Sequence, residues 1–184
     1  MGGSFDPPHE GHRRIGVMAL NRINLDCLWW MVTPGNPLKD VAALPPLETR
    51  MRRAAKAAAH PRIVISGAEK VFDTRFTADL VAILKRRAPA VRFVWVMGSD
   101  NLAEMHLWED WRRIARALPI VAIGRPGFLP AALSSRAAQA LWRWRVDEAD
   151  APTLADCDPP AWAFLTGPRT AASSTALRGR VNPS

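Results

Sequence analysis

Short apolar runs alternate with amphipathic segments along the 184-residue chain. The apolar runs are typical of buried strands, because they are short and rich in branched or aromatic side chains. The clearest is VRFVWVM at 91–97, and DCLWWMVT at 26–33 ends at a proline. The predicted strands are 26–33, 62–66, 91–97, 120–123 and 161–165.

The amphipathic segments predict helices, because their apolar residues recur on one side at the helical period. Segment 47–59 is rich in alanine and carries its arginines on one side, and Thr77 is placed to cap the next segment. The predicted helices are 47–59, 77–85, 108–117, 131–144 and one that begins at Ser174. The acidic, proline-rich stretch 147–160 is interpreted as a surface loop.

The alternation of strands and helices predicts parallel βαβ crossovers and a three-layer α/β fold around a parallel sheet. The length suits one domain over residues 1–184. Ligands bind such sheets at the carboxyl ends of the strands, so we expect a site in the loops that follow the strands.

The first strand of this fold is expected to be missing from the sequence. A glycine-rich loop before a helix normally follows a strand, but Gly2 and Gly3 directly follow Met1. Such a strand would lie near the centre of the sheet, so its loss should expose apolar surface and lower stability. Our hypothesis is a mis-assigned start or a truncated chain, which could also be inactive.

Composition points to the cytoplasm. No stretch approaches the roughly 20 apolar residues that a membrane span needs, and the amino terminus lacks the blocks of a signal peptide. Cys27 and Cys157 have no metal or redox spacing and fit a reducing compartment. The sequence leaves a homo-oligomer open.

The net charge of +8 has two readings. One is a nucleic-acid-binding surface. The other is a solvated, arginine-rich surface whose field gathers small anionic substrates. Because the arginine pairs lie on several predicted helices, we favour the second reading and do not expect nucleic acid as a partner.

The motif GGSFDPPHEGH at 2–12 carries the clearest chemistry. His9 and His12 are three residues apart at the start of a predicted helix, so both imidazoles can point the same way. They would lie beside free backbone N–H groups at the positive end of the helix dipole, which favours an anion. There they can donate hydrogen bonds to phosphate oxygens. A metal pair or two capping histidines would explain a bare HxxH.

The long motif resembles the signature of the HxGH nucleotidyltransferases, which share a Rossmann-like fold. The resemblance implies that His9 and His12 bind ATP phosphates and stabilise the pentacovalent transition state, with Gly2, Gly3, Ser4 and Phe5 beside the nucleotide. A second element, SSTALR at 173–178, resembles the family's SSTxxR. It implies phosphate contacts from Ser173, Ser174, Thr175 and Arg178, although a generic capped helix would look similar.

The middle of the chain resembles the nicotinate mononucleotide adenylyltransferase family. The loop TPGNPLK at 33–39 matches an Asn-containing, proline-rich loop that ends in a basic residue. Asn36 and Lys39 would lie at the substrates, and Lys39 can meet a phosphate as a point charge. Many members have histidine and then a basic residue there, whereas here Lys39 precedes Asp40.

Two further stretches carry this resemblance. DTRFTAD at 73–79 matches the segment in which a threonine amide helps to recognise the nicotinate carboxylate, which implies Thr77; Phe76 replaces the usual tyrosine. MGSDNL at 97–102 matches G-x-D-x-L, which implies nucleoside contacts from Gly98 and Asp100. The following WED implies that Trp108 stacks on the pyridine ring, with Glu109 beside it. Arg125-Pro126-Gly127 also fits the family.

The implied reaction is adenylyl transfer from ATP to nicotinate mononucleotide, with release of pyrophosphate, in NAD biosynthesis. Mg²⁺ would be held mainly by phosphate oxygens and water, and the sequence shows no metal cluster. His12, Lys39 and Arg178 would face the leaving pyrophosphate, and His9 and Ser174 the other ATP phosphates. The alternatives are another adenylyl- or cytidylyltransferase, such as the phosphopantetheine enzyme, and a non-enzymatic nucleic-acid-binding module.

Overall fold

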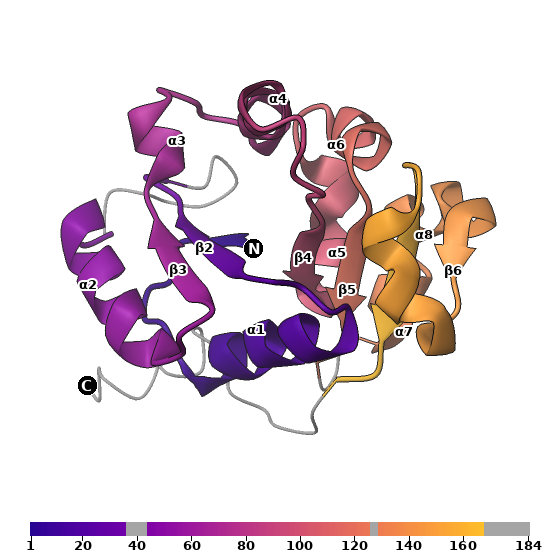
Figure 1. Ribbon diagram of the computed structural model, residues 1–184, viewed down its shortest axis with the longest axis horizontal. Helices are drawn as coiled ribbons and strands as arrows, with labels where there is room; N and C mark the ends of the chain where they lie inside the picture. The colour runs from indigo at the N-terminus through magenta and orange to yellow at the C-terminus, as the bar shows by residue number, and fades with distance from the viewer. Residues whose placement is uncertain (36–43, 126–128, 168–184) are drawn as a thin grey trace.

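Two parallel sheets form the centre of the computed structural model, which describes residues 1–35, 44–125 and 129–167 (Figure 1). The first sheet has the order β1 (Gly2–Gly3), β2 (Leu28–Val32), β3 (Ile63–Ser66). The second has the order β4 (Trp95–Gly98), β5 (Ile120–Ile123), β7 (Trp162–Leu165), β6 (Arg145–Val146). Every strand pairing is parallel, as the alternation of elements predicts.

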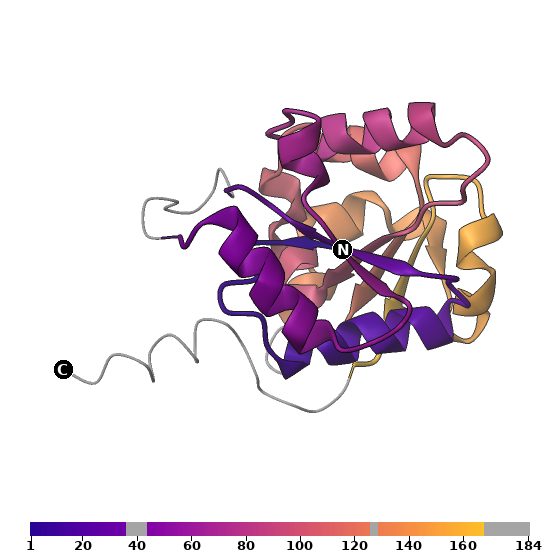
Figure 2. The same cartoon turned by 60° about the vertical axis from the view of Figure 1, so that its left-hand side comes forward.

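Helices cover both faces of the strands. Figures 1 and 2 show α1 and α2 on one side of the strands and α4 and α6 on the other, which confirms the α/β class. The helices are α1 (Glu10–Arg22), α2 (Leu47–Ala58), α3 (Ala68–Val71), α4 (Thr77–Arg87), α5 (Ser99–Glu104), α6 (Trp111–Ala117), α7 (Leu129–Leu133) and α8 (Arg136–Ala140). Three 3-10 helices, η1 (Met105–Leu107), η2 (Trp142–Trp144) and η3 (Glu148–Asp156), complete the described elements.

The side-chain alternation of β4 divides the core into two clusters. Val96 packs with α1 and β2, whereas Trp95 and Met97 pack with α4, α5 and α6. Successive residues of a strand point to opposite faces, so a strand that is apolar throughout buries both faces. The continuous apolar runs in the sequence have this origin.

Several elements have the predicted bounds. Strand β5 covers the predicted residues 120–123, and α2 ends at Ala58 because Ala59 adopts a left-handed conformation, with φ of 38°. Thr77 begins α4 as predicted, but the N-cap residue is Phe76 and no side chain caps the helix. The capping role of Thr77 is therefore wrong, which leaves its hydroxyl and amide for other contacts.

Other predicted bounds are wrong. The helix predicted at 131–144 is broken into α7, α8 and η2, because the Ser135 hydroxyl caps a new helix by accepting from the Ala138 N–H. The helix predicted at 108–117 begins only at Trp111, after Asp110 takes a φ of 48°. The stretch 147–160 is not a plain loop, since it contains η3, and the short edge strand β6 precedes it.

The region before the glycine-rich loop also needs a correction. Gly2 and Gly3 themselves form the short strand β1, which pairs with Met31 and Val32 of β2. A first strand is thus present over two residues rather than wholly missing. The helix predicted from Ser174 lies outside the described residues.

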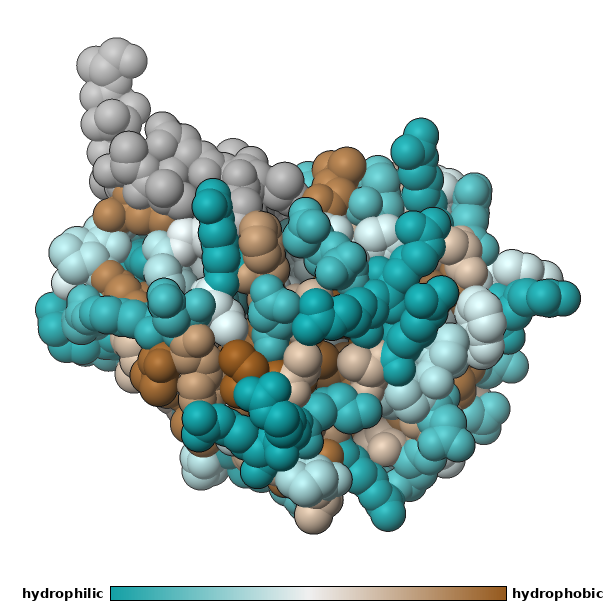
Figure 3. Space-filling model, turned by 90° about the horizontal axis from the view of Figure 1, so that it is seen from above, coloured by the Kyte–Doolittle hydropathy of each residue, from teal (hydrophilic) through white to brown (hydrophobic). Residues whose placement is uncertain are grey.

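The surface agrees with the sequence pattern. The face above α3, α4 and α6 is mostly hydrophilic, with hydrophobic side chains in small groups (Figure 3). Among the described residues, no helix is long and apolar enough to cross a membrane.

Candidate active site

A pocket of about 180 Å³ opens at the carboxyl ends of β1, β2 and β3, where the topology predicts a ligand site. We name it the tryptophan pocket, because the indoles of Trp95 and Trp108 form part of its wall. It brings together five of the predicted site residues. Its lining is Gly2, Gly3, Thr33, Gly35, Glu69, Arg75, Phe76, Thr77, Trp95, Asn101, Leu107, Trp108 and Glu109.

The two indoles meet edge to face, with ring centroids 6.4 Å apart and an interplanar angle of 86°. Trp95 is a core residue, whereas Trp108 is only partly buried and follows η1. The indole Nε1 of Trp95 is buried without a hydrogen-bond partner among the described residues. The pocket therefore offers an aromatic wall to a flat ligand.

Two charged residues of this pocket were not predicted. Glu69 is 6% exposed, and burial raises the pKa of its carboxyl, although a hydrogen bond from Thr33 opposes the shift. Arg75 is exposed and forms no ion pair with a described residue; its guanidinium lies 5.9 Å from the centre of the Phe76 ring. Arg75 directly precedes the predicted recognition segment, and that position was the available signal.

A second group, the histidine cluster, consists of His9, His12, Asp100 and Arg125. His9 is the N-cap residue of α1 and is 6% exposed. His12 is the third residue of the helix. Their rings face each other with centroids 3.8 Å apart, as their spacing predicts. The backbone N–H of His9 donates to Nδ1 of His12 at 3.2 Å.

Both imidazoles of the cluster are neutral at physiological pH. Burial lowers the pKa of His12 to about 2, with further lowering by His9 and Arg125. Burial also lowers the pKa of His9 to about 4, helped by Arg125 and opposed by Asp100. Because Nδ1 of neutral His12 accepts a hydrogen bond, its proton must be on Nε2, which can donate to a ligand.

Other polar atoms of the cluster also lack partners. Both ring nitrogens of His9, Oδ1 of Asp100 and Nε of Arg125 are buried without a hydrogen bond to a described residue. Asp100 and Arg125 pair with each other through Oδ2 and Nη1 at 3.1 Å. Buried polar groups without partners destabilise a fold, so a concentration of them indicates a place where a polar ligand completes the bonding.

Gly98 differs from its expected role. A Cβ at this position would collide with the Asp100 carboxylate and would lie 2.9 Å from Nε of Arg125. The missing side chain therefore makes room for the Asp100–Arg125 pair rather than directly for a ligand. The hydroxyl of Ser99 fixes the same corner by accepting from the Arg125 backbone N–H at 2.8 Å.

Phe5 supports the histidines from the core. Phe5 is 1% exposed, and its ring stacks on the Trp30 ring with centroids 4.9 Å apart. The centroid of the His12 ring also lies 4.9 Å from that of Phe5. Its backbone has a φ of 48°, which is costly for a residue with a side chain. The side chain of Phe5 thus positions His12. Only the backbone of Phe5 is left to contact a nucleotide.

Arg50 holds the loops around the site and was missed in the sequence. It projects from α2 and is 1% exposed. Its guanidinium donates to the carbonyl oxygens of Ser4 at 2.9 Å, Thr33 at 2.7 Å and Pro34 at 3.1 Å, and also to Pro45. One arginine therefore ties the glycine-rich loop to the loop after β2. Sequence alone offers little signal for it, because helix 47–59 contains several arginines.

The remaining predicted site residues lie outside the described part of the chain. These are Asn36, Lys39, Ser173, Ser174, Thr175 and Arg178. Gly35, which directly precedes Asn36, lines the tryptophan pocket.

Comparison of the sequence with known proteins shows which family the chain belongs to. The family model described as cytidylyltransferase-like matches residues 1–180. A protein of Bradyrhizobium sp. (strain ORS 278), named probable nicotinate-nucleotide adenylyltransferase, is 53% identical over 178 residues, which are 97% of this chain and 93% of the relative. The chain belongs to the nicotinate-nucleotide adenylyltransferase family. A family member of the same name from Brucella abortus (strain 2308) is 52% identical over 177 residues, or 96% of this chain and 91% of the relative.

Solved structures give the same fold. The structure of Plasmodium falciparum nicotinic acid mononucleotide adenylyltransferase complexed with NaAD superposes with a TM-score of 0.71, at 18% identity, over 97% of this chain and 80% of that one. The complex of the same protein with APC gives a TM-score of 0.69, with the same identity and coverage. Membership of this family makes the chain a nucleotidyltransferase with a Rossmann-like α/β fold.

Proposed function

We propose that the chain transfers the adenylyl group of ATP to nicotinate mononucleotide, which gives nicotinate adenine dinucleotide and pyrophosphate. The observation that carries the proposal is the pair of neutral imidazoles, His9 and His12, in contact at the start of α1. It lies in a chain of the nicotinate-nucleotide adenylyltransferase family, beside a pocket with aromatic walls. The product places the reaction in NAD biosynthesis.

The chemical step needs no nucleophile from the protein. A phosphate oxygen of the mononucleotide attacks the α-phosphorus of ATP in line, and the bond from that phosphorus to the β-phosphate oxygen breaks as pyrophosphate leaves. The task of the protein is to position the two substrates and to stabilise the charge that develops on the phosphates.

His12 supplies a fixed donor for that charge. Its Nδ1 is held by the His9 backbone N–H, so the Nε2–H remains for a phosphate oxygen. His9 offers a second neutral ring, whose nitrogens have no partner among the described residues. The Asp100–Arg125 pair, with unbonded Oδ1 and Nε, offers an acceptor for a ribose hydroxyl and a donor for a phosphate.

The tryptophan pocket takes the pyridine ring in this proposal. Trp108 offers a flat face, and Thr77, as the first residue of α4, has a backbone N–H at a helix start, where anions bind well. Arg75 lines the same pocket and can attract the carboxylate of nicotinate. These groups support the acid over the amide as the substrate.

The residues outside the described part complete the proposal. Lys39 and Arg178 would meet the leaving pyrophosphate, Asn36 the mononucleotide, and Ser173, Ser174 and Thr175 the ATP phosphates. In the described residues, no group of three or more His, Cys, Asp or Glu side chains could hold a metal ion. We expect Mg²⁺ to enter with ATP, held by phosphate oxygens and water, and to neutralise phosphate charge.

The setting of the enzyme also belongs to the proposal. Cys27 and Cys157 are free thiols. Unpaired thiols fit a reducing cytoplasm, which is where we place the protein. A homo-oligomer stays a prediction.

The test is pyrophosphate release from ATP and Mg²⁺ with nicotinate mononucleotide, nicotinamide mononucleotide or phosphopantetheine as the acceptor. We expect release mainly with nicotinate mononucleotide, and its loss in His12→Ala. Equal or greater release with phosphopantetheine would move the chain to another activity of the superfamily. Silence with every acceptor in a folded protein, together with salt-dependent DNA binding, would contradict the enzyme altogether.

A further inference from the structure

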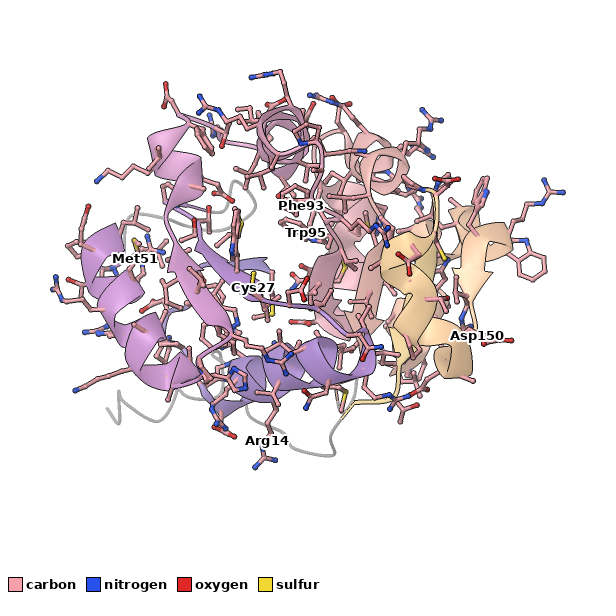
Figure 4. The ribbon with its side chains drawn as sticks, viewed as in Figure 1. Arg14, Cys27, Met51, Phe93, Trp95 and Asp150 are labelled. Atoms are coloured by element: carbon pink, nitrogen blue, oxygen red, sulfur yellow. The ribbon has the colours of Figure 1, made fainter. Side chains whose placement is uncertain are left out.

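One carboxyl group in the wall of the tryptophan pocket serves none of the steps proposed above. Glu69 belongs to the short helix α3, lines the pocket and is 6% exposed. Trp95, labelled in Figure 4, lies on the β4 side of the same pocket. Glu69 has no ion-pair partner among the described residues. Its surroundings therefore disfavour the charged form, in agreement with the raised pKa of its carboxyl.

The hydrogen bonds around Glu69 also favour the protonated form. Thr33 is buried, and its hydroxyl donates to the carbonyl oxygen of Gly35 at 2.9 Å. The same hydroxyl is in hydrogen-bond contact with the Glu69 carboxyl. A hydroxyl has one proton, so it can donate to only one of these two acceptors at a time. If Glu69 carries a proton, it donates to Oγ1 of Thr33, and Thr33 keeps its bond to Gly35.

The basic residues of the neighbouring elements are engaged elsewhere. Lys70, the next residue of α3, pairs with Glu48 of α2 at 2.6 Å. Arg50 of α2 donates to four carbonyl oxygens, among them that of Thr33. Neither cation forms an ion pair with the carboxyl of Glu69.

The pocket itself contains more acidic than basic side chains. The charged residues that line it are Glu69, Arg75 and Glu109. Arg75 and Glu109 are exposed, whereas Glu69 is buried. Charges at exposed positions are screened by water and salt, so the charge of Glu69 is the one that a bound ligand would feel most.

The pyridine carboxylate would bring a second negative charge close to Glu69. A sphere with the pocket's volume of about 180 Å³ is about 7 Å across, which is shorter than the Debye length of about 8 Å in physiological salt. When two carboxylates share a site of this size, the charged form of one is strongly disfavoured and that group binds a proton.

We propose that Glu69 is a specificity-determining residue, whose carboxyl takes up a proton as the anionic pyridine carboxylate of nicotinate mononucleotide enters the tryptophan pocket. This inference rests on the proposed function. The proton removes the repulsion between the two carboxylates and preserves the bond from Thr33 to Gly35. The amide of nicotinamide mononucleotide brings no charge, so it enters without this proton.

Proton uptake makes the choice between acid and amide depend on pH. If binding takes up one proton, the affinity falls by up to about tenfold for each unit of rising pH. Binding of the amide lacks this contribution. The preference for nicotinate over nicotinamide mononucleotide should therefore be greatest at low pH and decline as the pH rises.

The experiment measures protons taken up on binding to the full chain. Calorimetric titrations at pH 7 in two buffers of different ionisation enthalpy give this number for nicotinate and for nicotinamide mononucleotide. The phosphate is common to both ligands and cancels in the difference. We expect the acid to take up about 0.3 to 1 proton more than the amide. The difference should vanish in Glu69→Gln, which keeps a neutral group of the same shape, and persist in Glu104→Gln, on the exposed side of α5.

Turnover gives a second readout. Between pH 6 and pH 8 the ratio of kcat/KM for the acid to that for the amide should fall about fivefold in the unaltered chain. In Glu69→Gln it should change by less than about twofold. The comparison of acid with amide in the unaltered chain needs no variant, so it holds even if Glu69→Gln fails to fold.

Three results would overturn the inference while leaving the proposed function intact. The first is equal proton uptake with acid and amide in the unaltered chain. The second is a difference that persists in Glu69→Gln, because another group would then bind the proton. The third is weaker binding of the acid to Glu69→Gln at every pH, which would make Glu69 an ionised acceptor. If nicotinate mononucleotide neither binds nor releases pyrophosphate, the proposed function and the inference both fail.

Discussion

The histidine cluster and the tryptophan pocket are neighbours in the fold, since Asp100 and Asn101 are successive residues of α5, but they are built differently. In the cluster His9 is buried, the His12 ring packs against Phe5 and Trp30, and a hydrogen bond to Nδ1 of His12 fixes its tautomer. The pocket is assembled from the ends of several strands and is partly exposed. Rigidly placed donors suit the stabilisation of charge in the transition state. A partly open pocket lined by aromatic and charged side chains suits the selection of one substrate over another.

Replacement of His12 tests the cluster most strongly. We expect His12→Ala to lower kcat by about a thousandfold, because it removes a fixed donor to developing phosphate charge. The KM for nicotinate mononucleotide should change little, since the pyridine ring binds elsewhere. Steady-state pyrophosphate release measures both constants, with His60→Ala, in the connection between α2 and β3, as the control. A loss confined to KM would show that His12 acts in substrate binding.

Replacement of Arg50 tests whether the two regions depend on one support. Arg50→Met should lower the free energy of unfolding by about 3 kcal/mol, because it leaves buried carbonyl oxygens without donors. Activity per folded molecule should also fall, since the loops at Ser4 and Thr33 lose their link. Urea unfolding and activity measure the effects, with Arg52→Met on the exposed side of α2 as the matched control. Equal stability of the two variants would contradict this role.

Acid should lower the stability of the whole protein through the two histidines of the cluster. The folded-state pKa values of His9 and His12 lie near 4 and 2, below the ordinary value of 6.5. Below pH 6.5 the unfolded chain takes up protons that the folded imidazoles resist, so stability is full above that pH and falls as the pH drops. Between pH 7 and pH 5 we expect a loss of about 2 kcal/mol for each histidine.

Urea unfolding at pH 7, 6 and 5 measures this slope, and the double variant His9→Asn with His12→Asn serves as the comparison. The double variant should lose less stability over the same range. The same slope in both proteins would mean that other groups control the acid response.

Replacement of Arg75 should give the smallest effect and touches only the pocket. We expect Arg75→Gln to reduce the preference for nicotinate over nicotinamide mononucleotide by about fivefold, since an exposed ion pair contributes up to about 1 kcal/mol. The ratio of the two kcat/KM values measures it, with Arg86→Gln on α4 as the control. An unchanged ratio would leave backbone donors such as the Thr77 N–H as the source of the preference.

The sequence predicts the parts of the site that depend on local order. The spacing of His9 and His12 predicts their contact, because a helix start places residues three apart on one face. Thr77 and Trp108 both line the tryptophan pocket, and they lie in the segments that connect β3 to β4 and β4 to β5. The strand at 120–123 has its predicted bounds, since its partners on both sides are formed.

The missed parts depend on contacts between distant segments. Arg50 acts through carbonyl oxygens of other loops, and the pair of Asp100 with Arg125 joins two strand ends. No periodic pattern encodes such partners. The shortened β4 has a similar cause, because a strand needs a neighbour as well as an apolar sequence, and residues 91–94 have none on the β5 side.

The edge-to-face contact of Trp95 with Trp108 has an optical consequence. The chain contains eight tryptophans and no tyrosine, so its near-ultraviolet absorption and emission come almost wholly from indole rings. Two indoles held at 86° couple their transitions and contribute to the near-ultraviolet circular dichroism. A pyridine ring on Trp108 would quench its fluorescence and disturb that coupling. The pocket thus contains its own spectroscopic reporter, which can follow ligand entry without a label.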